Sequence, residues 1–518
     1  MERSFNFNDL FVFDLANNHQ GSVEHGLNII KGVAGVVYNH GIRGGMKFQF
    51  RQLDSFVHPS HHTGSDNKHI PRFFSTRLER SKYETMLAAV RKTGLLAICT
   101  PFDEKSVDVI IDMDFDIIKV ASCSATDWPL IEKIAEANKP VIFSTGGLDF
   151  KKIDDLVSYF NHRGVDFAIM HCVSIYPTPD EACQLNQIDA LRRRYPERVI
   201  GWSTHEDPDD DIPVQIAVAK GAGMFERHVG VETDDIKLNA YSSTPTQLDK
   251  WISGYLKAKT ICGAVERPPA LVTESEAIQG LRRGVYLKKT AKSDQILKRE
   301  NVYFAMPCGE HQLSSGDWSD GIVMTQFCSE DEALMLNAVR MPDASPLRVI
   351  KTAIHEVKAM LNEAKIVLNS EFDVEYSHHY GVENFRETGA VLINCINREY
   401  CKKIIVQLPG QNHPSHFHRK KEETFQVLWG ELFINVGGHE RKLFPGETLT
   451  IQPGVFHYFW TDTGAIFEEV STTNFNDDSY YRDKTINKMA REDRKTKVDH
   501  WGRFQIYNRA NPAGASGA

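Results

Sequence analysis

The sequence SKYETMLAAVRKTGLLAICTPF, residues 81–102, places two kinds of segment in direct succession. Residues 81–94 mix apolar and charged side chains in the manner of a surface helix, and this part ends in glycine. Residues 95–102, LLAICTPF, are apolar almost throughout, as expected of a strand that is buried on both faces of a parallel sheet. The stretch therefore predicts a helix that leads directly into a buried strand.

The same succession recurs through the first half of the chain. Another helix-like segment is TPTQLDKWISGYLKAKTICG at 244–263. Strand–helix alternation repeated eight times is typical of a (β/α)8 TIM barrel, in the α/β class. The alternative is an open doubly wound sheet, but eight units suit closure and no GxGxxG fingerprint is present. The eight apolar runs are FVFDLA (11–16), GMKFQF (45–50), LLAICTPF (95–102), DIIKVAS (116–122), PVIFSTG (140–146), DFAIMHC (166–172), RVIGWST (198–204) and GMFERHV (223–229).

Length and composition set outer limits. A chain of 518 residues is too long for one hydrophobic core. The net charge of −9 argues against a nucleic-acid partner. No apolar run reaches the roughly 20 residues of a membrane helix, and the start, MERSFNFNDL, lacks the apolar core of a signal peptide. The nine cysteines form no CxxC pair, so we expect no disulfide framework. Together these observations predict a cytoplasmic protein without a membrane partner.

The periodicity changes after about residue 275. Short strands and turns follow, then a helix, then a strand-dense region with turns at LPGQN, VGGHE, FPGE and QPGV, which suits a small antiparallel barrel. We predict a barrel at 1–275, a small β-rich module at 279–345, a helical linker at 346–370, a β-barrel domain at 371–480 and a charged, disordered tail at 481–518.

Polar residues end nearly all of the eight runs. Because a TIM barrel carries its functional groups at the C-terminal ends of the strands, we expect these side chains to share one mouth. Lys47 and Lys119 lie inside buried runs, where a lysine needs a counter-charge or a ligand. With nearby hydroxyls they indicate a phosphate or carboxylate site, although a single strand-end hydroxyl is more often a turn or capping residue. These hydroxyls belong to Thr100, Ser122, Ser144 and Ser203.

Two histidines, His205 and His228, end consecutive runs in GWSTHE and FERHVG. Adjacent strand ends lie close enough for both imidazoles to reach one divalent cation that acts as a Lewis acid. A lone strand-end histidine is more often structural, but a pair in a polar mouth favours the metal. Together with Asp14 at the end of the first run, these groups indicate chemistry between a small phosphorylated anion and a carbonyl compound.

The motifs of this mouth resemble those of the sialic acid (nonulosonic acid) synthases, which condense phosphoenolpyruvate with an N-acylated hexosamine aldehyde. The resemblance covers nearly all of residues 10–240, in the order of the family. Residues 279–345 are dimly similar to the antifreeze-like (SAF) module of that family, a β-clip. The similar motifs are DLANNHQG (14–21), MKFQ (46–49), CTPFD (99–103), IKVAS (118–122), PVIFSTGG (140–147), HCVSIYPTP (171–179), IGWSTHE (200–206) and FERHV (225–229).

The resemblance implies a role for each matching position. Asp14 stands where the family carries a catalytic Glu, and it would act as a general base or orient water. His205 and His228 would bind Mn2+ or Mg2+, and a homodimer is implied. Phosphoenolpyruvate would be held by Lys47, Thr100, Lys119, Ser122, Ser144, Ser174 and Ser203, and the sugar would be contacted by Gln49, Tyr176 and Asp235.

The chain also departs from the family pattern, mostly on the sugar side. Ser124 replaces a Glu near the sugar, Thr204 an Asp beside the metal histidine, and Ser174 an Asn near the phosphate. Met306 stands where the antifreeze-like module presents an Arg, which weakens the expectation of a dimer. We interpret the barrel as running the same reaction on an altered acceptor. The alternative is a barrel that has lost catalysis.

A second metal site is predicted in the C-terminal region. GQNHPSHFHRKKEETFQVLWG (410–430) matches the first cupin motif, G-x5-H-x-H-x4-E-x6-G, and PGVFH (453–457) supplies the histidine of the second motif. In a strand, residues i and i+2 share a face, so His416 and His418 point together, and Glu423 and His457 arrive from neighbouring strands. Three imidazoles and a carboxylate suit Mn, Fe, Ni or Zn.

Three functions remain open at this point. The first is a nonulosonic acid synthase that takes phosphoenolpyruvate and an aldose, with a cupin that isomerises, epimerises or binds a sugar. The second is a cupin isomerase or epimerase with a non-catalytic barrel. The third is a carbohydrate-binding protein without turnover.

Overall fold

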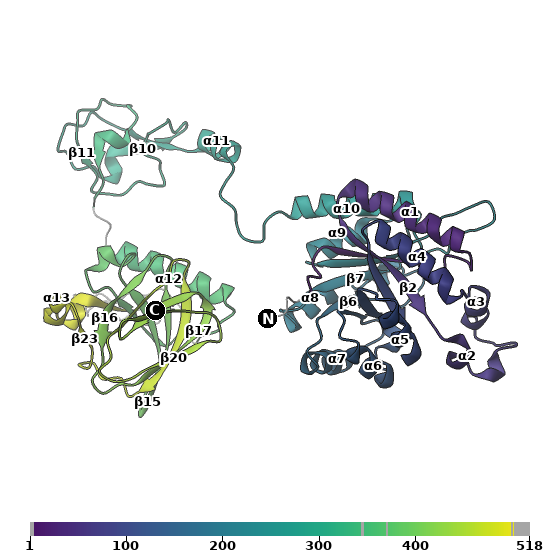
Figure 1. Ribbon diagram of the computed structural model, residues 1–518. Helices are drawn as coiled ribbons and strands as arrows, with labels where there is room; N and C mark the ends of the chain where they lie inside the picture. The colour runs from purple at the N-terminus through teal and green to yellow at the C-terminus, as the bar shows by residue number, and fades with distance from the viewer. Residues whose placement is uncertain (1–4, 343–345, 369–370, 499–500, 502–518) are drawn as a thin grey trace. The chain divides into compact units, whose positions relative to one another are not determined.

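The computed structural model describes residues 5–342, 346–368, 371–498 and 501. The chain divides into two compact units, and the boundary between them along the sequence lies between Pro269 and Ala270 (Figure 1). Among the described residues, no helix is both long and apolar enough to cross a bilayer.

The first unit is a closed barrel of eight parallel strands, which confirms the predicted fold class. Every strand lies within one residue or two of an expected apolar run. The first strand closes the ring, because Asp14 aligns with Lys47 on one side and with His228 on the other. The strands are β1 (Leu10–Asp14), β2 (Arg43–Phe50), β3 (Leu96–Pro101), β4 (Ile117–Val120), β5 (Val141–Ser144), β6 (Phe167–Cys172), β7 (Ile200–Thr204) and β8 (Met224–His228).

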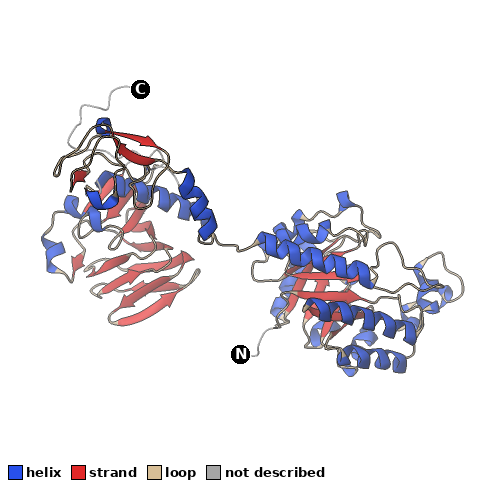
Figure 2. Ribbon diagram, turned by 90° about the horizontal axis from the view of Figure 1, so that it is seen from above, coloured by secondary structure: helices blue, strands red, loops and turns tan. Residues whose placement is uncertain are grey.

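Helices surround these strands, as Figure 2 shows in blue around the red barrel. The first helix begins at the cap Ser22, whose hydroxyl accepts from the His25 amide, and ends at Gly41, which adopts a left-handed φ of 60°. The connection from β2 is the longest and adds α2 (Leu53–Phe56), η1 (Pro59–His61) and α3 (His69–Ser75). The others are α1 (Val23–His40), α4 (Arg80–Lys92), α5 (Glu104–Asp112), η2 (Ser122–Ser124), α6 (Trp128–Glu136), α7 (Phe150–His162), η3 (Asp180–Ala182), α8 (Asn186–Arg194), α9 (Ile212–Ala219) and α10 (Pro245–Cys262).

The second unit begins with a small group of short strands around its own apolar core, which includes Val285, Leu297 and Met324. The antifreeze-like identity of this region stays a prediction. Its elements are α11 (Val272–Leu281), β9 (Gly284–Leu287), η4 (Arg299–Asn301), β10 (Val302–Ala305), β11 (Val323–Met324), η5 (Leu336–Ala338) and β12 (Val339–Arg340).

The remainder of this unit consists of two antiparallel sheets, consistent with the expected cupin. Seven strands follow the order β20-β17-β22-β15-β14-β13-β24, and five follow β19-β18-β21-β16-β23. The strands are β13 (Asp373–Ser377), β14 (Ala390–Asn397), β15 (Tyr400–Gln407), β16 (Asn412–Phe417), β17 (Glu423–Gly430), β18 (Leu432–Val436), β19 (His439–Leu443), β20 (Thr448–Ile451), β21 (His457–Trp460), β22 (Ala465–Thr472), β23 (Tyr480–Tyr481) and β24 (Lys495–Val498), with η6 (Val382–Asn384) between β13 and β14.

Two predicted boundaries need correction. The helix α12 (Pro346–Glu363), expected as a linker, buries Ile350, Ile354 and Val357 in the same core as the strands of the seven-stranded sheet. The predicted tail begins too early, because α13 (Lys484–Lys488), α14 (Arg491–Arg494) and β24 follow residue 481, and β24 pairs with β13. Val498 and Trp501 lie in the core there, although the surrounding sequence is rich in charged residues. The remainder of the predicted tail, residues 499–518 apart from 501, lies outside the described residues.

Candidate active site and candidate metal centre

The barrel interior changes from apolar to polar along each strand. Leu10 and Val12 belong to the apolar cluster that fills one end of the barrel, and Asp14 is the next residue on the same face of β1. Ile117 and Lys119 repeat this order on β4, as do Met224 and Glu226 on β8. Because inward side chains recur every second residue, each strand that fills the barrel floor also delivers a polar group to its C-terminal rim.

At this rim, two acids and two lysines form a buried network. Lys47 Nζ lies 2.9 Å from Asp14 Oδ2 and also contacts Glu226 Oε1. Lys119 Nζ lies 3.2 Å from Glu226 Oε2. Burial alone would raise the pKa of Asp14, but the charge of Lys47 and its hydrogen bond outweigh burial and hold that pKa below its ordinary value. Asp14 is therefore ionised at neutral pH.

The predicted hydroxyls lie around the same lysines. Lys119 Nζ donates to Ser144 Oγ at 2.5 Å, and Ser122 Oγ accepts from the Gly146 amide at 3.0 Å. The Thr100 hydroxyl is buried and has no hydrogen-bond partner within the described ranges. These donors and cations suit an oxygen-rich anion.

The two barrel histidines lie next to each other, with ring centroids 5.3 Å apart. His205 Nδ1 donates to the Val173 carbonyl at 3.1 Å, which leaves the lone pair on Nε2. Burial, and then the neighbouring His228, lower the pKa of His205 to about 3, and burial also lowers the pKa of His228. His205 is thus a neutral imidazole with one ring nitrogen held by the backbone, which is the form that binds a metal. His228 lies beside it, with Nε2 3.5 Å from Asp14 Oδ2, so the pair fits a divalent cation.

One cavity of about 850 Å³ joins these groups, a size that suits small-molecule substrates. Asp235 does not line it and lies exposed in the loop after β8. Tyr176 does line it, with its ring centroid 4.2 Å from that of His205. The predicted residues that line the cavity are Asp14, Lys47, Gln49, Thr100, Lys119, Ser122, Ser144, Ser174, Tyr176, Ser203, His205 and His228.

Glu226, Tyr241 and Arg51 are among the lining residues that sequence reasoning left out of the predicted site. Glu226 precedes His228 by two residues, so the shared strand face could have revealed it. Tyr241 stands 5.2 Å from His228 between ring centroids, and it comes from a loop with no periodic signal. Arg51 follows β2 and lines the same cavity.

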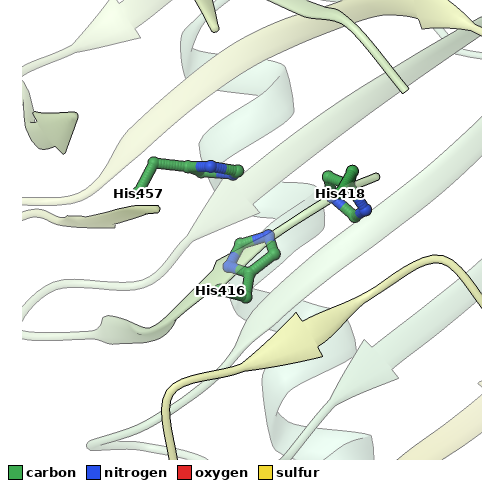
Figure 3. A group of neighbouring side chains, drawn as sticks. All are labelled: His416, His418 and His457. Atoms are coloured by element: carbon green, nitrogen blue, oxygen red, sulfur yellow. The ribbon is translucent and has the colours of Figure 1, made fainter. Parts of the chain in front are cut away.

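The cupin unit contains the predicted histidine group. Figure 3 shows His416, His418 and His457 gathered around one space, and their ligand atoms lie within 4.8 Å of one another. Each Nδ1 donates to a backbone carbonyl, at 3.0 Å to Pro414, 2.6 Å to Asp478 and 3.2 Å to Val455 respectively. All three Nε2 atoms therefore remain available to a metal, which is the arrangement expected of histidine ligands.

Glu423 stands beside this group rather than within it. Its carboxylate oxygens lie 3.4 Å from His418 Nε2 and 3.2 Å from His457 Nε2. Lys421 also contacts Glu423 and lies 3.0 Å from Glu469, so the carboxylate is shared with an ammonium group. Within the described part of the chain, Glu423 Oε2 and His457 Nε2 are buried without a hydrogen-bond partner, which fits a metal between them.

Comparison with known proteins finds relatives of both the barrel and the cupin domain. Residues 43–267 match the NeuB family and residues 404–469 match the cupin domain. The crystal structure of a spore coat polysaccharide biosynthesis protein E from Chromobacterium violaceum is 41% identical with a TM-score of 0.63, and the match covers 64% of this chain and 100% of that one. The N-acetylneuraminate-9-phosphate synthase of Drosophila melanogaster is 34% identical over 150 residues, 29% of this chain and 40% of that protein. The N,N'-diacetyllegionaminic acid synthase of Campylobacter jejuni is 23% identical over 278 residues, 52% of this chain and 81% of that protein.

Barrel, polar rim and relatives together define an enzyme of the phosphoenolpyruvate-dependent class that forms carbon–carbon bonds. The chain belongs to the NeuB family, and it carries a cupin domain in addition.

Proposed function

We propose that the barrel condenses phosphoenolpyruvate with an N-acyl hexosamine or a related aldose, giving a nonulosonic acid and inorganic phosphate. The observation that carries the proposal is that two lysines and two histidines, distant along the chain, converge on one cavity. Lys47, Lys119, His205 and His228 come from four strands and line one cavity large enough for both substrates.

The lysines and hydroxyls provide the phosphoenolpyruvate site in this proposal. Lys119 and Ser144 already form a short donor pair, and Ser122 lies beside the Gly146 amide. A phosphate or carboxylate placed there meets charge-assisted donors on buried side chains, where such hydrogen bonds are strong. Glu226 lies between the ammonium groups of Lys47 and Lys119, and its negative charge favours their protonated form before the substrate binds.

The bond changes follow from these positions. The methylene carbon of phosphoenolpyruvate attacks the aldehyde carbon of the open-chain sugar, whose carbonyl oxygen takes the displaced electron pair and a proton and becomes a hydroxyl. A water oxygen adds to the phosphoenolpyruvate carbon that becomes electron-poor. The bond from that carbon to the phosphate oxygen then breaks, and phosphate leaves. A divalent cation held by His205 and His228 would supply Lewis-acid polarisation of the aldehyde. The ionised Asp14 carboxylate, held 2.9 Å from Lys47, would take the proton of the water.

The cupin is proposed to bind a divalent transition metal through His416, His418 and His457, with Glu423 as a further ligand. Its open coordination positions would take hydroxyl or carbonyl oxygens of a sugar, so that the domain isomerises, epimerises or retains the acceptor or the product. A homodimer is proposed only from the resemblance to the synthase family.

The test measures phosphoenolpyruvate consumption and product mass with the full chain, a set of divalent metals and a panel of aldoses. We expect a product whose mass equals phosphoenolpyruvate plus aldose plus water minus phosphate. Lys119→Met should abolish it because the anion loses its buried counter-charge, whereas Lys151→Met on the exposed face of α7 should match the wild type. His205→Ala should abolish turnover while the cupin keeps its metal.

Two results would contradict the proposal. One is that no aldose supports phosphoenolpyruvate consumption with any metal. The other is sugar isomerisation that depends on His418 and is indifferent to Lys119→Met, which would favour a cupin isomerase with a non-catalytic barrel.

A further inference from the structure

An arginine without a carboxylate partner lies at the rim of the barrel cavity. Arg51 follows the last residue of β2, and its guanidinium carbon lies 4.2 Å from the ring centroid of Phe73 and 3.6 Å from that of Phe102. Its one hydrogen bond goes from Nη2 to the neutral Oε1 of Gln49, at 3.0 Å. Among the described residues, no Asp or Glu lies within ion-pair distance, Nη1 has no hydrogen-bond partner, and Nε is buried without one.

This arginine is charged. Burial lowers the pKa of Arg51 to about 10, which still leaves the group protonated at neutral pH. A half-buried guanidinium ion without a carboxylate in ion-pair contact carries a desolvation cost, and its contacts with two aromatic faces offset only part of that cost. An anion that enters the cavity would offset the rest.

The charges that line the cavity are unevenly placed. Its acids are Asp14 and Glu226, and both contact the lysines of the network, Lys47 or Lys119. The other lining cations are Arg51 and Lys68, and Lys68 has no partner within the described ranges. Two positive charges on the β2 side of the cavity thus remain without compensation.

Gln49 places Arg51 on the acceptor side of the reaction. Its Nε2 donates to Asp14 Oδ2 at 3.1 Å, and its Oε1 accepts from Arg51, so one amide separates the proposed base from the guanidinium. The proposed phosphoenolpyruvate donors, Lys119 and Ser144, come instead from β4 and β5. An acceptor whose aldehyde faces Asp14 would extend along Gln49 toward Arg51.

We propose that Arg51 binds an anionic group, a phosphate monoester or a carboxylate, at the end of the acceptor aldose that is remote from its aldehyde. This inference rests on the proposed function. The aromatic rings on either side hold the guanidinium plane, which favours recognition of an oxyanion by two donors. Lys68, exposed at the cavity edge, adds a second positive charge for the same group.

A binding experiment measures the affinity of the Arg51 site for an anionic group in the absence of turnover. The probes are glucitol 6-phosphate and glucitol, which lack an aldehyde and cannot condense, titrated calorimetrically into the full chain. We expect the phosphorylated probe to bind about 10- to 100-fold more tightly, the worth of one or two hydrogen bonds to a charged group. Arg51→Met should remove the difference and Arg51→Lys should keep part of it. Arg77→Met, whose arginine pairs with Asp54 on the exposed face of the same connection, should retain it in full.

A turnover experiment identifies the anion. Phosphoenolpyruvate depletion and product mass are measured with a neutral hexosamine, its 6-phosphate and a hexuronate. Preference for the 6-phosphate or for the hexuronate identifies which anionic group the acceptor carries. Arg51→Met should raise the KM for that acceptor about 10- to 100-fold and change the KM for the neutral hexosamine little.

The two proposals fail in different ways. Equal binding of both probes, together with condensation of neutral aldoses that Arg51→Met leaves unchanged, overturns the inference and leaves the synthase intact. Absence of condensation with every acceptor overturns the proposed function, and with it the role of Arg51 in that reaction.

Discussion

Replacing Glu226 by Gln tests the electrostatics of the barrel directly. The change keeps the size of the side chain and removes the charge that lies between Lys47 and Lys119. Asp14 still neutralises Lys47 at 2.9 Å, so the loss falls mainly on Lys119, which keeps only the Ser144 hydroxyl and a backbone carbonyl. The apo protein should therefore be destabilised, and an anionic substrate should restore it.

The magnitude follows from the burial of the pair. Removing one partner of a buried ion pair costs about 3–5 kcal/mol, and we expect the lower end because Lys47 retains Asp14. At roughly 2–4 °C per kcal/mol for a domain of this size, the barrel transition should fall by about 6–12 °C. Burial already holds the pKa of Lys119 below its ordinary value, and loss of Glu226 lowers it further. The folded variant then binds fewer protons than the unfolded chain, so its stability deficit should shrink as the pH rises toward the unfolded pKa of about 10.4.

The assay is thermal unfolding of the full chain with and without phosphoenolpyruvate, at several pH values. Phosphoenolpyruvate should raise the Tm of Glu226→Gln more than that of the wild type, because the ligand replaces the missing carboxylate. Glu84→Gln, which breaks an exposed pair with Arg80, is the matched control and should shift the Tm by no more than about 2 °C. A variant as stable as the wild type, or one that phosphoenolpyruvate stabilises less, would refute the reasoning.

Two further predictions concern the cupin unit. Elemental analysis should show that His416→Ala binds one metal ion per chain fewer than the wild type, whereas His439→Ala on exposed β19 should bind as much as the wild type. Equal metal content in both variants would mean that the three histidines are not the metal site. Ile354→Ala should destabilise the cupin by about 2–5 kcal/mol and speed hydrogen exchange in β14 and β15, because the side chain is fully buried in their core. The exposed Ile261→Ala is its control, and unchanged exchange would mean that α12 is a linker after all.

The sequence alone was sufficient for everything that depends on local spacing. Apolar runs alternating with helix-like segments predicted the closed barrel, and the polar residues in and at the ends of these runs predicted that Asp14, Lys47 and Lys119 share one mouth. The cupin histidines followed in the same way from the H-x-H spacing and the second motif. Local geometry determines such positions before any long-range contact forms.

Only the tertiary structure decided which groups meet across these elements. Barrel closure brings Glu226 between two lysines that precede it by more than a hundred residues, and it leaves Asp235 in an exposed loop. The stacking of Arg51 between Phe73 and Phe102 depends on the path of the long β2 connection, and the pairing of β24 with β13 depends on a free sheet edge. No period or motif encodes these contacts, because each depends on the packing of segments that are distant along the chain.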